Sequence, residues 1–175
     1  MFEKTQAILL HCQKYSDKAV ILHTYTQNNG RMNFMVYGQA KKGLKGILST
    51  PLTMVEISYD NKPGQEMHVI HSLSPVYLPE PNPDLIFSRM FISEVIYKTL
   101  KQPMADERVY EFLAGYIRRQ ATGYRLEDGA ARLQVRGEGL QAFMTQFSVL
   151  LGYGGEWLDE WKELKSVEMI KEMMN

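Results

Sequence analysis

The first sixty residues alternate between apolar and polar positions with the two-residue period of β-strands. This pattern predicts strands over residues 5–12, 19–26 and 31–37. The second and third of these flank a turn, residues 27–30, that contains Asn29-Gly30, a dipeptide that tolerates the positive φ of a tight hairpin. We therefore predict that residues 19–26 and 31–37 pair as antiparallel neighbours.

Two further strands are predicted over residues 52–59 and 66–73, separated by the turn residues 60–64. Five short antiparallel strands in so few residues suit a small closed barrel of the oligonucleotide-binding (OB) type. Such barrels bind their ligands on the face of strands two and three and on the neighbouring loops. Because some bind oligosaccharides or proteins, the architecture alone does not identify the ligand.

The remainder of the chain changes to the spacing of amphipathic helices after a proline-rich stretch, residues 75–83, which we interpret as a linker that ends the barrel. Helices are predicted over residues 84–100, 106–121, 140–151 and 156–174, and residues 124–139 are predicted to form a loop. The first two helices are expected to pack as an antiparallel pair. The predicted fold class is α+β: an N-terminal five-stranded OB-type β-barrel in residues 1–80, followed by an all-α helical domain in residues 81–175.

The formal net charge of the 175-residue chain is zero, so a surface that binds an acidic partner has to be local. The single cysteine, Cys12, excludes a disulfide within the chain and a four-cysteine zinc site, and it fits a reducing cytoplasm. No apolar run approaches the roughly eighteen residues needed to cross a bilayer, so no membrane association is expected.

Catalytic motifs are missing from the sequence: it has no Walker loop, no Gly-x-Ser-x-Gly elbow and no His-Glu-x-x-His. His68 and His71 are three residues apart in a predicted strand, so their side chains are expected on opposite faces and unable to share a metal. We expect no catalytic residue, metal site or cofactor.

A basic, glycine-rich loop directly after the third predicted strand is the main candidate site. By itself such a loop is more often a solvated surface turn. Next to an OB-type ligand face, however, ammonium groups can neutralise phosphates while an aromatic ring stacks on a base. The candidate nucleic-acid contacts are Lys41, Lys42, Lys45 and Arg31 for phosphates, Lys14 and Lys18 beside the groove, and Tyr37 or Tyr25 for a base.

Several segments resemble the amino-terminal part of the bacterial DNA repair protein family RecO. They are Lys-Thr-Gln-Ala-Ile-Leu-Leu-His at 4–11, Tyr-Ser-Asp-Lys at 15–18, His-Thr-Tyr-Thr at 23–26, the stretch 30–38 with the basic loop, and 51–57. Residues 91–97 are similar to the first helix after the barrel in that family, and residues 147–153 resemble a helix end that follows. The last predicted helix, 156–174, does not match the family.

The resemblance implies a non-enzymatic recombination mediator that binds single- and double-stranded DNA and anneals complementary strands. It also implies that the protein helps RecA replace single-strand-binding protein, together with RecR. Carried over by position, the DNA-contacting loop of the family falls on Lys41, Lys42 and Lys45. The expected location is the cytoplasm, at the nucleoid during repair.

A second hypothesis remains open: an OB-type protein-interaction module, a truncated or diverged paralogue that docks a recombination partner through its helical half and has little affinity for DNA. An enzymatic hypothesis has no convergent set of polar residues to support it.

Overall fold

The computed structural model describes residues 2–38, 44–62, 64–80, 82–101, 105–121 and 129–153. The predicted helix 156–174 and part of the basic loop lie outside these residues. The chain divides into two compact units, Met1–Ala121 and Thr122–Asn175, and each is described by itself.

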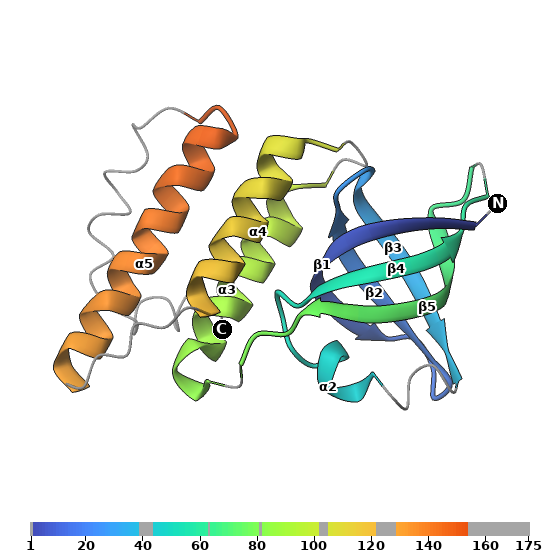
Figure 1. The fold of residues 1–175 in the computed structure, drawn as a ribbon, viewed down its shortest axis with the longest axis horizontal. Coiled ribbons are helices and arrows are strands. Elements are labelled where there is room, and N and C mark those ends of the chain that lie inside the picture. Colours follow the sequence, from blue (N-terminus) through green and yellow to red (C-terminus); the bar gives the residue numbers. More distant parts are fainter. Residues whose placement is uncertain are drawn as a thin grey trace. The chain divides into compact units, whose positions relative to one another are not determined.

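Five strands form a closed barrel in the first unit (Figure 1), which confirms the predicted α+β fold class. The strands are β1 (Phe2–Lys14), β2 (Ala19–Thr26), β3 (Gly30–Tyr37), β4 (Met54–Asp60) and β5 (Met67–Tyr77), in the order β1-β2-β3-β5-β4 around the barrel. One prediction was wrong: β3 and β5 pair in parallel. The reason is geometric, because a closed ring with an odd number of strands cannot alternate in direction all the way round.

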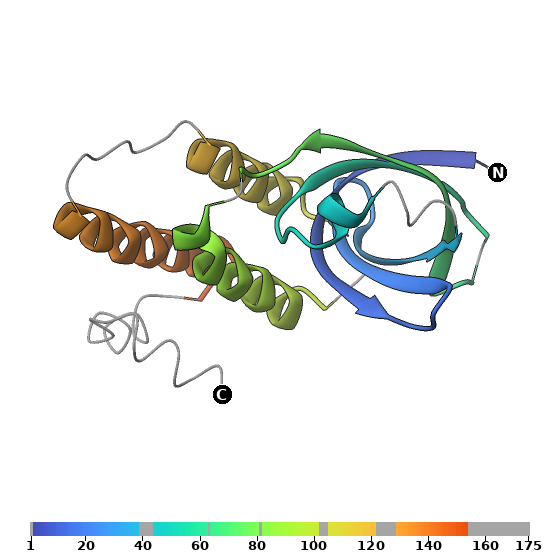
Figure 2. The same cartoon turned by 90° about the horizontal axis from the view of Figure 1, so that it is seen from below.

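Alternate residues of the strands fill the barrel interior, as the two-residue period predicts. The ring of Phe34 is fully buried and meets the ring of Tyr59 edge-on, with centroids 5.1 Å apart. The short helix α2 (Lys45–Leu48), which the sequence pattern did not predict, packs Ile47 and Leu48 against this core (Figure 2). A single helical turn is too short to show a helical period in the sequence.

The strand β5 continues to Tyr77, through part of the stretch that was predicted to be a linker. Pro75 pairs with Val55 at a point where the register between β4 and β5 shifts. Proline is compatible with such an irregularity because it has no N–H to contribute to the ladder. The linker prediction was therefore wrong for residues 75–77.

Two helices follow the barrel in the first unit: α3 (Pro83–Thr99) and α4 (Glu107–Ala121). They run in opposite directions, as predicted (Figure 1). The first turn of α4 is capped by Asp106, whose Oδ1 accepts a hydrogen bond of 2.9 Å from the backbone N–H of Arg108. This cap begins the helix at the residue the sequence predicted.

A bulge in β1 provides a backbone contact for α3. The pairing with β2 steps from Leu9 to His11, which leaves Leu10 as the extra residue of the bulge. The carbonyl of Leu10 then accepts a hydrogen bond from the buried hydroxyl of Ser93 on α3. The irregularity in the strand thus supplies the acceptor that positions the helix.

The second unit contains α5 (Gly129–Leu150), so the prediction of a loop was wrong for residues 129–139. Glycines and charged residues break the apolar period there, but adding residues to an existing helix costs far less than starting one. The helix ends with hydrogen bonds from the N–H groups of Gly152 and Tyr153 to the carbonyls of Val149 and Ser148, both 3.0 Å.

The compact unit Met1–Ala121 groups α3 and α4 with the barrel, and a domain boundary at residue 80 stays a prediction. Within the described residues, no helix is long and apolar enough to span a membrane.

Candidate nucleic-acid interface

The outer face of β2 and β3 carries four directly opposed pairs of side chains, which we call the outer ladder. Opposed residues of an antiparallel pair share one face of the sheet, and every second residue of each strand points the same way. The pairs, from one end to the other, are Tyr25 with Arg31, His23 with Asn33, Ile21 with Met35, and Ala19 with Tyr37. The outer ladder contains three of the predicted site residues.

At one end of the outer ladder, Arg31 is bound to α3. Its guanidinium donates a hydrogen bond of 2.6 Å to the backbone carbonyl of Tyr97 and lies 3.9 Å from the centroid of the Tyr97 ring. The carbonyl is in the last turn of the helix, where cations are favoured by the helix dipole. Arg31 therefore joins the barrel to the helix in this structure, which is a different use from the predicted phosphate contact.

Tyr25 is buried at the same end, with 2 % of its surface exposed. Its hydroxyl oxygen accepts a hydrogen bond of 3.4 Å from the backbone N–H of Asp106, and burial raises the pKa of the phenol. A ring without an accessible face cannot stack on a base, so the prediction for Tyr25 was wrong for this structure. We call this end, with Arg31 and His23, the covered end.

The middle of the outer ladder is apolar. Ile21 and Met35 are buried beside Ala19, and Met67 of β5 packs against them. These side chains form a small hydrophobic cluster outside the barrel interior. The middle of the outer ladder therefore carries no charged side chain.

At the other end, which we call the open end, two tyrosines face solvent. Tyr37 is 52 % exposed, and Tyr15, in the turn between β1 and β2, is 66 % exposed. A backbone hydrogen bond joins the two segments, because the N–H of Gly38, next to Tyr37, donates to the carbonyl of Lys18 at 2.8 Å. Gly38 has a φ of +49°, a value that glycine adopts readily as the chain leaves β3 for the basic loop.

The open end also carries the two lysines predicted beside the groove. Lys14 is exposed, and its Nζ lies 2.8 Å from Oδ1 of Asp17, a carboxylate that is itself almost fully exposed. Lys18 is exposed in the same turn. Exposed pairs of this kind are weak and easily exchanged for another anion.

The basic loop begins at the open end, directly after Gly38. Lys41 and Lys42 lie outside the described residues, and for Lys45 the structure describes only the backbone, at the start of α2. Lys14, Lys18 and Tyr37 thus lie at the same end of the barrel, although Lys14 pairs with Val20, whose side chain lies on the other face of the sheet. Tyr15 was missed in the sequence, although an aromatic residue in a polar turn is a signal for a binding surface.

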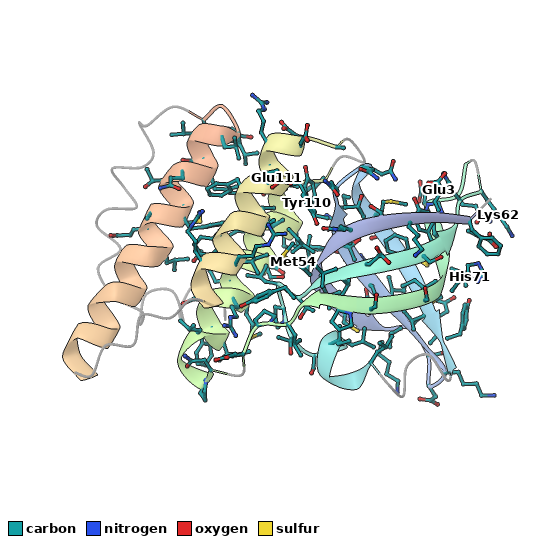
Figure 3. The ribbon with its side chains drawn as sticks, in the orientation of Figure 1. Glu3, Met54, Lys62, His71, Tyr110 and Glu111 are labelled. Carbon is teal, nitrogen blue, oxygen red and sulfur yellow. The ribbon has the colours of Figure 1, made fainter. Side chains whose placement is uncertain are left out.

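A second polar cluster, at the end of the barrel away from α3 and α4, has a structural role (Figure 3). The two carboxylate oxygens of Glu3 accept hydrogen bonds of 2.9 Å from the Tyr59 hydroxyl and from the Asn61 side chain. The Asn61 and Tyr59 bonds lower the pKa of Glu3. His71 pairs with Asp60 at 3.3 Å in the same region.

No group of three or more potential metal ligands occurs among the residues that the structure describes. His68 is buried and His71 is exposed on the same strand, as expected for residues three apart.

Comparison with known proteins gives one family for the barrel. Residues 1–78 match the family model described as recombination protein O, N terminal. Among curated relatives, the chain is 31% identical to the DNA repair protein RecO of Phocaeicola vulgatus over 125 residues, which cover 67% of this chain and 51% of the relative. It is 28% identical to RecO of Porphyromonas gingivalis over 117 residues, covering 63% and 48%.

The chain is also 29% identical to RecO of Bacteroides fragilis over 118 residues, which cover 65% of this chain and 49% of the relative. The chain spans about half the length of these relatives. The barrel and the matched residues agree with the resemblance seen in the sequence. Residues 1–78 are thus similar to the N-terminal domain of the recombination protein RecO.

Proposed function

We propose that this chain binds DNA through the open end of the outer ladder and acts in DNA repair and recombination. The observation that carries the proposal is the asymmetry of the ladder. One end is covered by Tyr97 of α3 and by the backbone at Asp106, whereas at the other end Tyr15 and Tyr37 are exposed, and Lys14 and Lys18 are exposed in the same stretch of chain as Tyr15. Aromatic faces next to ammonium groups are the combination that binds a nucleic-acid strand.

The relatives support the biological setting, because each is named a DNA repair protein. Strand annealing and the loading of RecA with RecR in the presence of single-strand-binding protein are the finer parts of the proposal. They rest on the similarity of the barrel to this family alone. The chain is proposed to have no catalytic activity of its own, since its site supplies charge and stacking surfaces.

The electrostatic part of the proposal is testable by the salt dependence of binding. Labelled single-stranded DNA is titrated at several salt concentrations with the native chain and with a triple variant of Lys41, Lys42 and Lys45 to Ala. Each phosphate contact contributes roughly −0.7 to the slope of log affinity against log salt for single strands. We expect a clear negative slope in the native chain and a slope shallower by about 2 in the variant.

The matched control removes three other exposed lysines, Lys4, Lys62 and Lys98. It changes the net charge by the same amount and should keep the native slope. Absence of binding at low salt, or equal slopes in all three proteins, contradicts the proposal. That outcome favours the protein-interaction module instead, which pull-down with RecR, RecA and single-strand-binding protein would then examine.

A further inference from the structure

The covered end of the outer ladder contains a group that can change its charge near neutral pH. His23 is 9 % exposed and lies where β1, β2, β3 and α3 meet. Its ring stacks on His11 at 5.9 Å between centroids and meets the Tyr97 ring edge-on at 5.2 Å. We call His11, His23, Arg31 and Tyr97 the latch cluster.

Both ring nitrogens of His23 have partners from neighbouring strands. Nδ1 lies 2.7 Å from Oδ1 of Asn33, and Nε2 lies 3.4 Å from Oε1 of Gln13. Side-chain amides can serve as donor or acceptor, so a neutral imidazole is satisfied in this position. The neutral form of His23 therefore fits the cluster without any carboxylate.

The other titratable and charged groups that face His23, among the described residues, are His11 from β1, Arg31 from β3 and Tyr97 from α3. Burial lowers the pKa of His23, and the charges of Arg31 and His11 lower it further. The hydrogen bond to Asn33 acts in the opposite sense and is outweighed. The surroundings thus oppose a positive charge on His23.

A proton on His23 would place a second cation beside the one that holds the helix. The face of Tyr97 already carries the guanidinium of Arg31 at 3.9 Å. The imidazolium and the guanidinium would then compete for the same ring and repel each other in a poorly hydrated space. The contact that gives way is the one between the strands and the last turn of α3.

We propose that His23 is the titratable group of an acid-sensitive latch, and that its protonation releases the last turn of α3, residues 95–99, from the barrel. Because folding lowers the pKa of His23, the unfolded chain binds the proton more readily than the folded one. The stabilisation from the neutral latch is complete above about pH 6.5, the pKa of an unperturbed histidine. It is lost as the pH falls through the lower pKa of the folded state.

Amide hydrogen exchange of the whole chain tests this latch. The measurement compares peptides from residues 95–99 and from β4 at about pH 7.5 and pH 5.5, after correction for the intrinsic pH dependence of exchange. In the native chain we expect exchange in residues 95–99 to be several-fold faster at the lower pH, while β4 stays protected. In His23→Gln, which keeps a polar side chain but cannot titrate, the two pH values should give the same corrected rates.

His71→Gln is the matched control, because this half-exposed histidine on β5 lies outside the latch cluster. It should retain the native acid response. An unchanged acid response in His23→Gln, or no response in the native chain, would overturn the proposal. Should His23→Gln not fold, nuclear magnetic resonance titration of the native His23 ring decides, since a pKa at or above 6.5 excludes the latch.

Discussion

The two ends of the outer ladder consist of similar residues but differ in exposure to solvent. Each end carries a tyrosine on the same face of the same sheet, yet Tyr25 is 2 % exposed and Tyr37 is 52 % exposed. The cations differ in the same way, because Arg31 is bound to Tyr97 whereas Lys18 is exposed. At the covered end, Tyr97 of α3 contacts Arg31, and the backbone N–H of Asp106, just before α4, contacts Tyr25.

This comparison separates residues that hold the molecule together from residues that are available to a ligand. At the covered end, burial and hydrogen bonds are already used within the chain, so substitution there should change stability. At the open end, the side chains make few internal contacts, so substitution should leave stability nearly unchanged.

Arg31→Met should destabilise the chain by about 2–3 kcal/mol, because it removes a charged hydrogen bond and a cation–π contact between β3 and α3. Urea denaturation followed by circular dichroism measures the change in the free energy of unfolding. Lys18→Met is the matched control at the open end and should change it by less than about 0.5 kcal/mol. If both substitutions changed the free energy of unfolding equally, the two ends of the ladder would not differ in their structural role.

The sequence was sufficient for the barrel because alternation of apolar and polar residues reports directly on strands. It identified β2 with both of its bounds, and the Asn29-Gly30 turn that joins it to β3. It failed at α2 and in the first part of α5, where one helical turn or a glycine-rich segment shows no period. The parallel pairing of β3 with β5 required the closed ring, which no single segment encodes.

The candidate site was harder to predict for a different reason. Local pattern places Tyr25, Arg31 and Tyr37 on one face, but it does not show which of them a distant segment covers. Arg31 and its acceptor Tyr97 are 66 residues apart in the chain. Exposure at the two ends of the ladder is therefore a tertiary property, and only the structure separates a binding residue from an internal contact.

Tyr37→Ser should weaken binding of single-stranded DNA by about 1–3 kcal/mol, which corresponds to roughly 5- to 150-fold in affinity, since a stacked ring contributes that much per base. Fluorescence anisotropy at fixed salt measures the loss. Tyr37→Phe keeps the ring and should keep native affinity. Loss of binding in Tyr37→Phe as well, or native binding in Tyr37→Ser, would show that stacking at the open end does not contribute.

Tyr25→Phe should destabilise the chain by about 0.5–1 kcal/mol, because the backbone N–H of Asp106 loses its acceptor while the ring stays packed. The matched substitution at the open end is Tyr37→Phe, which removes a hydroxyl from an exposed ring. It should leave the free energy of unfolding unchanged within error. Thermal and urea denaturation of the pair would reveal whether the two hydroxyl groups differ as the structure requires.

The smallest expected effect is a gain in DNA affinity when a carboxylate at the open end is removed. Asp17 lies 2.8 Å from Lys14 at the open end, and both side chains are largely exposed, so their pairing adds little to stability. Asp17→Asn should change the free energy of unfolding by less than about 0.5 kcal/mol. It should also strengthen DNA binding by about twofold at low salt, because Lys14 becomes free for a phosphate and a repelling charge is lost.

The matched control for this gain is Glu111→Gln, which removes one negative charge from an exposed position on α4 (Figure 3). If the gain came from net charge alone, both variants would bind DNA more tightly to the same degree. A gain confined to Asp17→Asn, and one that disappears as salt is raised, assigns it to the open end, because local charges are screened over about 8–10 Å near physiological ionic strength. Weaker binding by Asp17→Asn would mean that the carboxylate orients Lys14 for the strand.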